Sequence, residues 1–459
     1  MRKFQPILMI LLGLMLLLSA CASNTNTPAT NKDEEENTTE EASEGTDRES
    51  DEKVEIEFWH SMGGNLGESI DVIAKEFSES QDTYVVNAEF QGSYEESLTK
   101  FRSIGGTTDA PAIIQTFEVG TKFMIDSGFI EPIHTFIEKD GYDVTQLEEN
   151  ILNYYTYDGK QYSMPFNSST PVLIYNKDAF KEVGLDPENP PRTYSEIKDA
   201  ASKLKTDERF GFSMLTYGWF FEELLATQGG MYVNNDNGRS NTATEATFNG
   251  VEGLRVFKWL DEMNQAGTFG NFGTVWDDIR AAFQTEKVAM YMDSSAGTKG
   301  IIDNADFEVG VAFIPHPDEV EPNGVIIGGA SLWMSKGIAE EEQLAAWEFM
   351  KYVNSPDVQA KWHVETGYFS IHPEAYENDI VKEQWAEYPQ LKVTVDQLQA
   401  TKKGVATQGA LISVFPESRQ HIVTALEKLY QGSDPKEVLD EAVIQSNRAI
   451  EIANKTQGN

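Results

Sequence analysis

Glu118 and Asp293 are the residues of this chain whose types would best suit catalysis. Two carboxylates held close together can act as the acid and base of a glycoside hydrolase. The sequence gives no sign of such closeness, and it contains no Gly-x-Ser-x-Gly, P-loop, dinucleotide or HExxH motif. Six histidines are scattered without metal-ligand spacing, and a single cysteine offers them no partner. We therefore expect a protein without catalysis, metal or cofactor, and a secreted hydrolase is the weaker alternative.

Cys21 is the only cysteine, and it follows a segment typical of a secretory signal. Two basic residues precede an almost unbroken apolar run over residues 7–18, which is shorter than the roughly 20 residues that span a bilayer. Residues 18–21 read Leu-Ser-Ala-Cys and resemble a bacterial lipobox, in which the cysteine becomes the lipid-modified first residue. We predict a signal peptide over residues 1–20 and a palmitate-bearing anchor at Cys21. An ordinary cleaved signal with an incidental cysteine is the alternative.

Residues 22–53 contain hardly any apolar side chain, and acids outnumber bases there by eleven to three. Such a segment cannot bury enough apolar surface to offset its ordering entropy. We therefore predict an acidic, disordered tether over residues 21–53, followed by a solute-binding region over residues 54–459. The net charge of −39 argues against nucleic acid as a partner and against charge-driven binding to an anionic membrane.

Alternating strand and helix patterns begin the folded part. Residues 54–59, 84–90 and 112–117 are predicted strands, and apolar side chains recur at helical spacing over residues 66–78. The third strand is almost continuously apolar, as expected when both faces of a sheet are covered. This alternation predicts an α/β lobe with a largely parallel sheet.

A different pattern follows from residue 154. A hairpin is predicted over residues 154–166 around Asp158-Gly159, and Thr193 with Glu196 forms a capping box for a helix ending near residue 205. The remaining predicted strands are residues 171–175, 210–215, 288–293 and 325–333. The remaining predicted helices are residues 177–183, 251–264, 277–283, 341–353, 356–363 and 418–429.

Five short stretches carry a family resemblance when taken in order. They are residues 58–62 (Phe-Trp-His-Ser-Met), 166–173 (Phe-Asn-Ser-Ser-Thr-Pro-Val-Leu), 175–180 (Tyr-Asn-Lys-Asp-Ala-Phe), 327–333 (Ile-Gly-Gly-Ala-Ser-Leu-Trp) and 366–368 (Thr-Gly-Tyr). From about Phe58 to about residue 450 the chain resembles the glycerol-3-phosphate-binding proteins of bacterial ABC importers, within extracellular solute-binding protein family 1.

The resemblance implies a two-lobed α/β fold that closes on its ligand like a clamshell around a hinge, as periplasmic binding proteins do. Lobe one would comprise about residues 54–166 and 294–340, and lobe two about residues 167–293 and 341–459. The implied protein is a monomer on the extracellular face of the bacterial cell membrane, held there by its lipid anchor alone. It would deliver its solute to the permease subunits of an ABC importer.

The resemblance also assigns ligand-contacting positions, whose hydroxyl, backbone and carboxylate groups suit a small polyol with an anionic group. These positions are Tyr94, Glu118, Ser169, Trp219, Ser294, Gly329 and Tyr368. The structural alternatives are a solvated acid for Glu118, half-buried aromatics for the tyrosines and core packing for Trp219. We expect Arg419 to form a surface ion pair and His60 to cap the first strand.

Two departures from the family pattern bear on the ligand. Leu411 stands where the family has an arginine that pairs with phosphate, and Thr216 stands where it has a tryptophan. Loss of a guanidinium weakens phosphate binding unless Lys402 or Lys403 replaces it. The predicted ligand is therefore sn-glycerol-3-phosphate or a bulkier glycerophosphodiester, and a neutral sugar or oligosaccharide is the alternative.

Overall fold

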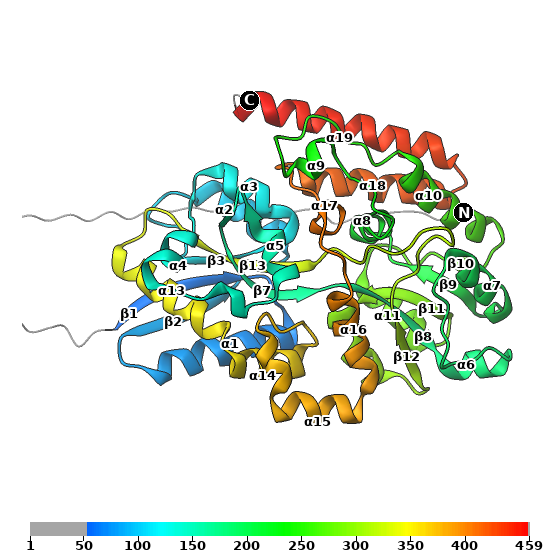
Figure 1. The fold of residues 1–459 in the computed structure, drawn as a ribbon, viewed down its shortest axis with the longest axis horizontal. Coiled ribbons are helices and arrows are strands. Elements are labelled where there is room, and N and C mark those ends of the chain that lie inside the picture. The colour runs from blue at the N-terminus through cyan, green and yellow to red at the C-terminus, as the bar shows by residue number, and fades with distance from the viewer. Residues whose placement is uncertain (1–52, 458–459) are drawn as a thin grey trace, which may run out of the picture. The chain divides into compact units, whose positions relative to one another are not determined.

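The computed structural model describes residues 53–457. The predicted signal peptide, Cys21 and all but the last residue of the predicted tether lie outside this range. Within it, none of the helices combines the length and the apolar character that a membrane span requires. The described residues form two large β-sheets and a short two-stranded one, with helices packed around the large sheets (Figure 1).

The first sheet has the strand order β2-β1-β3-β13-β4, and β7 pairs with the far part of β13. Strands β1, β2 and β3 are parallel, while β13 runs antiparallel to its neighbours. The bounds are β1 (Val54–His60), β2 (Tyr84–Phe90), β3 (Ile113–Phe117), β4 (Ile130–Glu131), β7 (Met164–Ser169) and β13 (Gly328–Ser335). Every residue of β3 is buried, including the polar Gln115 and Thr116.

The second sheet has the strand order β10-β9-β11-β8-β12. Strands β9, β10 and β11 are parallel, and β8 runs antiparallel to both β11 and β12. The bounds are β8 (Pro171–Asn176), β9 (Phe210–Met214), β10 (Phe269–Gly270), β11 (Val288–Ser294) and β12 (Val309–Ala312). Two mixed sheets with helical cover confirm the predicted α/β class.

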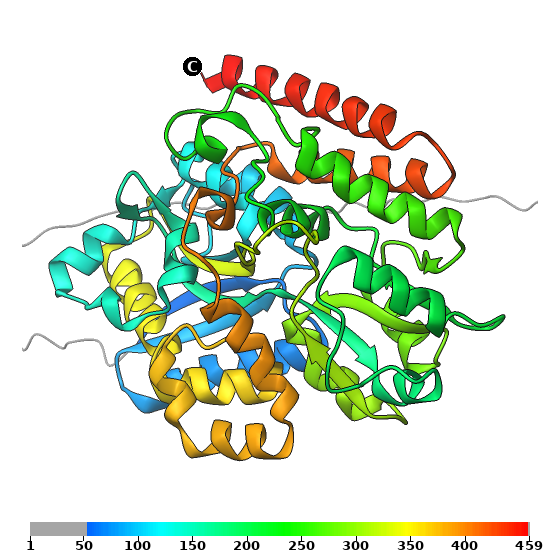
Figure 2. The same cartoon turned by 45° about the vertical axis from the view of Figure 1, so that its right-hand side comes forward.

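Helices fill the connections between these strands. In the first half of the chain they are α1 (Gly64–Ser80), α2 (Tyr94–Ile104), α3 (Thr121–Ser127), α4 (His134–Asp140), α5 (Glu149–Tyr155), α6 (Lys177–Glu182), α7 (Tyr194–Leu204), α8 (Gly218–Ala226) and α9 (Asn234–Gly238). In the second half they are α10 (Val251–Gln265), α11 (Trp276–Gln284), α12 (Thr298–Asn304), α13 (Glu340–Val353), α14 (Pro356–Thr366), α15 (Asp379–Glu387), α16 (Pro389–Gln399), α17 (Val405–Gln408), α18 (Phe415–Tyr430) and α19 (Pro435–Gln457). Short 3₁₀ helices are η1 (Glu118–Gly120), η2 (Val144–Gln146), η3 (Ser295–Gly297) and η4 (Pro373–Glu377). Helices α18 and α19 pack side by side (Figure 2).

The hairpin predicted over residues 154–166 is shorter than expected. Tyr154 and Tyr155 form the last turn of α5, and only the two-residue strands β5 (Thr156–Tyr157) and β6 (Lys160–Gln161) flank the turn. The following residues form β7, which pairs with β13 instead of continuing the hairpin. Two adjacent buried tyrosines are compatible with a strand and with the end of a helix, so the sequence pattern could not distinguish the two structures.

Strand pairing also differs from the predicted boundaries between the lobes. Strand β12, which had been expected in lobe one, hydrogen bonds to β8 in the second sheet. Helix α13, expected in lobe two, instead buries Phe349 against Phe58 and Phe77 of the first sheet region. The boundaries between the lobes therefore lie at other residues than the sequence suggested.

Gln397 joins two of the crossings between the sheets. Its Nε2 donates to the carbonyl oxygen of Pro171, at 2.6 Å, at the start of β8, and to Thr170 Oγ1, at 3.4 Å, between β7 and β8. Its Oε1 accepts from the backbone N–H of Ile314, at 2.7 Å, between β12 and β13. One buried amide thus ties together the two segments that link the sheets.

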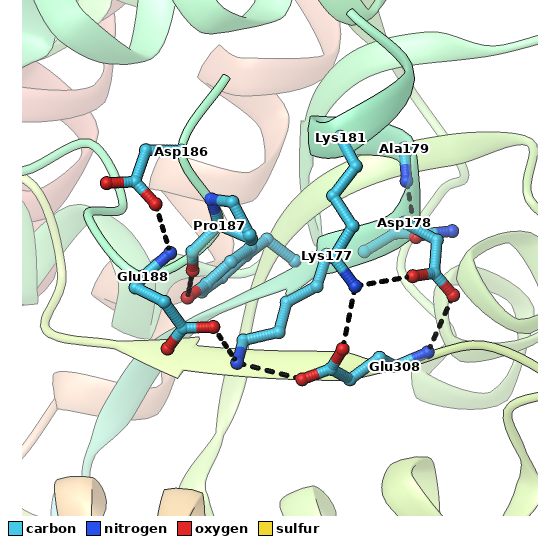
Figure 3. A network of polar contacts seen from close by, with 10 residues as sticks. Lys177, Asp178, Ala179, Lys181, Asp186, Pro187, Glu188 and Glu308 are labelled. Atoms are coloured by element: carbon cyan, nitrogen blue, oxygen red, sulfur yellow. Dashed lines mark hydrogen bonds and ion pairs between the residues drawn. The ribbon is translucent and has the colours of Figure 1, made fainter. Parts of the chain in front are cut away.

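An exposed network of ion pairs braces the far end of the second sheet (Figure 3). Glu308, just before β12, contacts both Lys177 and Lys181 of α6, at 3.0 and 2.8 Å. Asp178 and Glu188 complete the network. Such solvent-exposed pairs contribute at most about 1 kcal/mol each.

Candidate ligand-binding site

Asn167 of β7 connects the two predicted ligand tyrosines. Its Nδ2 donates to the hydroxyl oxygen of Tyr94 at 3.0 Å, and its Oδ1 accepts from Gln115 Nε2 at 2.7 Å. The hydroxyl of Tyr368 interacts with the same amide and with Tyr94. Because Asn167 comes from the middle of the chain, it brings together residues that are far apart in sequence.

Packing fixes the rings of both tyrosines. The ring of Tyr94 stacks on Phe117 at 5.3 Å and 4°, and the ring of Tyr368 stacks on Trp362 at 5.8 Å and 13°. Burial raises the pKa of the Tyr94 hydroxyl well above its usual value, and burial also raises the pKa of Tyr368. Both phenols are therefore neutral at physiological pH and can donate a hydrogen bond to an oxyanion.

Local structure explains the position of Tyr94. Ser93 caps α2, since its side chain accepts from the backbone N–H of Glu96 while the Glu96 carboxylate accepts from the backbone N–H of Ser93. This reciprocal capping box makes Tyr94 the first residue of the helix. The equivalent capping box at Thr193 was predicted from the sequence, whereas the one at Ser93 was not.

Glu118 shares an arginine with a second buried glutamate. Its Oε1 lies 2.7 Å from Arg419 Nη2. Arg419 also donates to both carboxylate oxygens of Glu222, from Nε at 2.5 Å and from Nη2 at 2.9 Å. The three side chains are 5%, 6% and 3% exposed in that order. The expectation that Arg419 forms a surface ion pair is wrong: α18 turns this residue inward, toward Glu222 of α8.

Burial and charge oppose each other in this group. Burial raises the pKa of the Glu118 carboxyl, and the Arg419 guanidinium opposes that rise. Burial raises the pKa of Glu222 to about 7, again against Arg419. The neighbouring Glu223 is fully buried, and its Oε2 accepts from the backbone N–H of Ile326 at 2.8 Å. Two carboxylates, those of Glu118 and Glu222, therefore contact the one guanidinium, and the Glu223 carboxylate bonds elsewhere.

Ser169, Gly329 and Trp219 meet where β7 pairs with β13. Ser169 lies opposite Gly328, and Ser168 lies opposite Gly329. Gly329 has φ +101°, and a Cβ there would lie 1.9 Å from the carbonyl oxygen of Asn167, so only glycine fits. A Cβ on Gly328 would lie 2.6 Å from the indole of Trp219.

Trp219 itself is 3% exposed, and its Nε1–H has no partner among the described residues. The same holds for the buried hydroxyl of Ser168. Both groups sit beside the predicted ligand residues, and a buried polar group without a partner costs about 1–3 kcal/mol. Their hydrogen-bonding capacity is therefore unused by the described residues.

Ser294 lies at the end of β11, opposite Pro171. Its Oγ accepts from the backbone N–H of Ala296 at 3.3 Å, which leaves its own hydroxyl hydrogen available to donate. The carbonyl oxygen of Ala296 would lie 3.0 Å from a Cβ on Gly367, the residue before Tyr368. The two segments that carry Ser294 and Tyr368 are thus close neighbours.

Asp293 and Arg280 form a further buried pair beside Ser294. Arg280 donates from Nε and Nη2 to the two carboxylate oxygens of Asp293, at 3.0 and 2.9 Å. The side chain of Arg280 is 28% exposed, and its positive charge opposes the rise that burial causes in the pKa of Tyr368. The site roles of Arg280, Asn167 and Glu222 were not predicted from the sequence, because their bonding partners lie elsewhere in the chain.

The two positions that depart from the family pattern are both buried and bonded to other residues. Leu411 is buried, and its backbone N–H donates to the carbonyl oxygen of Asn237. Thr216 is buried with its Oγ1 bonded to Asn271. Lys402 and Lys403 are exposed, and Lys403 pairs with Glu149, so neither has a recorded contact with the site residues.

Known proteins resemble this chain in sequence and in fold. Residues 72–393 match the family model described as bacterial extracellular solute-binding protein. The chain is 34% identical over 413 residues to the sn-glycerol-3-phosphate-binding periplasmic protein UgpB of Salmonella paratyphi A, a match that covers 87% of this chain and 94% of that protein. The match to UgpB of Escherichia coli K12 is 34% identical over 412 residues. The chain belongs to the bacterial extracellular solute-binding protein family.

Members of this family bind a solute outside the cytoplasm for an ABC importer, and the matched relatives are binding proteins. This chain is accordingly a solute-binding protein of an ABC importer. Its fold resembles UgpB of Mycobacterium tuberculosis in complex with glycerophosphocholine, with a TM-score of 0.75, 22% identity, and coverage of 88% of this chain and 100% of that one. It also resembles the cyclic α-maltosyl-1,6-maltose binding protein of Arthrobacter globiformis, with a TM-score of 0.73, 23% identity, and coverage of 87% and 99%. These likenesses confirm the two-lobed fold.

Proposed function

We propose that this protein captures sn-glycerol-3-phosphate or a glycerophosphodiester and delivers it to the permease of an ABC importer. The observation that carries the proposal is the chain of contacts from Tyr94 through Asn167 to Tyr368, with Glu118 and Arg280 close by. Neutral phenols can donate to phosphate oxygens, and a carboxylate can accept from glycerol hydroxyls. The identity to UgpB relatives supports the same ligand class.

Arg280 takes the place that the sequence analysis gave to Lys402 or Lys403. Its guanidinium uses two donors on Asp293 and stays partly exposed near Tyr368, so it can still offer a charge-assisted bond to phosphate. Ser294, Ser169, Trp219 and the backbone around Gly329 would supply further polar contacts. Because Leu411 provides no second guanidinium, a singly charged diester suits the site better than a doubly charged monoester.

Isothermal titration calorimetry of the full chain in mild detergent tests this function. We expect heat with glycerophosphocholine and with sn-glycerol-3-phosphate, and none with maltose. Binding of maltose alone would favour the second candidate, a neutral sugar, for which the buried Trp219 and the sugar-binding structural neighbour speak.

We further propose that the chain acts as a monomer on the extracellular face of the membrane, anchored through a lipid on Cys21. The lipobox at residues 18–21 supports this anchor. Metabolic labelling with palmitate should mark the wild-type protein and not Cys21→Ala, and the variant should leave the membrane fraction. Equal membrane retention of both proteins would refute the anchor.

A further inference from the structure

Glu222 occupies much of the hydrogen-bonding capacity of Arg419. Both of its carboxylate oxygens accept from the guanidinium, one from Nε and one from Nη2. The same Nη2 lies 2.7 Å from Oε1 of Glu118. Arg419 is therefore bound by two carboxylates while only one of them, Glu118, is a proposed ligand residue.

Because Arg419 and Glu222 are buried, their ion pair can influence which ligand charge the site accepts. The side chains of Arg419 and Glu222 are only 6% and 3% exposed, so water screens their charges weakly. The one guanidinium is already bonded by Glu118 and by Glu222, so its donors are engaged within the protein.

The geometry of α8 connects this group with the ligand contacts. Glu222 and Trp219 lie three residues apart on the same helix, so they project from neighbouring positions of its surface. Trp219 packs on Gly328, next to the proposed contact at Gly329. Tyr217, just before the helix, has its ring 5.7 Å from the Arg419 guanidinium carbon.

We propose that Glu222 is a specificity-determining residue that acts through Arg419. By holding Nε and Nη2, it withholds the guanidinium from a ligand phosphate and selects against doubly charged phosphomonoesters. Ligands whose phosphate carries a single charge, as in a diester, are disfavoured less. This inference rests on the proposed function, and it assigns the choice between the two proposed ligands to a residue that does not itself touch the ligand.

The test compares two ligands that share a glycerophosphate core and differ in charge. Calorimetry of the full chain in detergent would give dissociation constants for sn-glycerol-3-phosphate and glycerophosphocholine. We expect Glu222→Gln, which keeps the shape and removes the charge, to shift the ratio of the two constants toward the monoester by roughly tenfold. Glu222→Asp keeps the charge and should retain the wild-type preference.

Glu223→Gln is the matched control, because Glu223 is equally buried on the same helix but bonds to the backbone of Ile326. Its ratio should remain that of the wild type. An unchanged ratio in Glu222→Gln, or an equal shift in Glu223→Gln, would overturn the specificity role while the proposed function stands. Failure of the wild-type chain to bind either ligand would overturn the proposed function and this inference together.

Discussion

Asn167 is the residue on which the geometry of the site depends most. It donates to Tyr94 and accepts from Gln115, and all three side chains are at least partly buried. We predict that Asn167→Leu, which keeps the volume and removes these bonds, lowers affinity for the bound glycerophosphate ligand by about tenfold or more. Calorimetry would measure the change.

Asn354→Leu provides the control for that substitution. Asn354 is also fully buried, and its Nδ2 donates to the carbonyl oxygen of Met350 in α13, away from the ligand residues. We expect both variants to lose about 1–3 kcal/mol of stability, and only Asn167→Leu to lose affinity. Equal affinities in the two variants would show that Asn167 has a structural role alone.

Glu222 also makes stability depend on pH. Burial raises its pKa from 4.5 to about 7, so the folded protein holds this proton more tightly than the unfolded chain does. The contribution is fully present below pH about 4.5 and is lost as pH rises through about 7, with a total of about 3 kcal/mol. Glu222→Gln should therefore flatten the fall in the free energy of unfolding across this range. Urea denaturation at successive pH values measures it, and parallel curves for both proteins would contradict the prediction.

The sequence predicted which residues belong to this site better than it predicted which side chains bond to one another. Glu118, Tyr94 and Tyr368 came from family motifs, and the structure brings them together. The sequence placed Arg419 correctly on a helix, but its inward direction depends on Glu118 and Glu222, which come from distant segments. The sequence did not indicate the roles of Asn167 and Arg280. A side-chain amide or an arginine gains such a role only through the partners that the fold brings to it.

At the scale of elements, the capping box of α2 should influence binding through Tyr94. Ser93→Ala removes the side-chain acceptor at the start of this helix and should cost about 1 kcal/mol of stability. Since Tyr94 is the first helical residue, the loosened turn should also weaken ligand affinity by a few fold. Thermal unfolding and calorimetry together measure the two effects.

Thr193→Ala is the matched control for this element, because Thr193 and Glu196 form the same capping box on α7. Helix α7 carries none of the proposed ligand residues. We expect a similar loss of stability there and an unchanged affinity. A loss of affinity in both variants would mean that general destabilisation, and not the position of Tyr94, weakens binding.

Periodicity predicted most of the elements, including β1, α1, β2 and α18, because each has one face or both faces buried in a regular pattern. It failed where two structures bury the same residues, as at Tyr154 and Tyr155 in α5. It also could not assign elements to sheets. Strand β12 and helix α13 pack with partners that only the crossings between the sheets determine.

At the scale of the whole molecule, the dominant property is a net charge of −39. Like charges repel in the compact state, and they repel less when salt shortens the screening length from about 10 Å at 0.1 M to about 3 Å at 1 M. We predict that the melting temperature of the full chain rises by several degrees over that range of NaCl. The buried pair Arg419–Glu222 should weaken little, because water and ions do not reach it. An uncharged osmolyte such as sorbitol, at matched osmolality, separates screening from preferential exclusion. If sorbitol raised the melting temperature as much as NaCl, or if NaCl lowered it, charge repulsion would not be the property that limits stability.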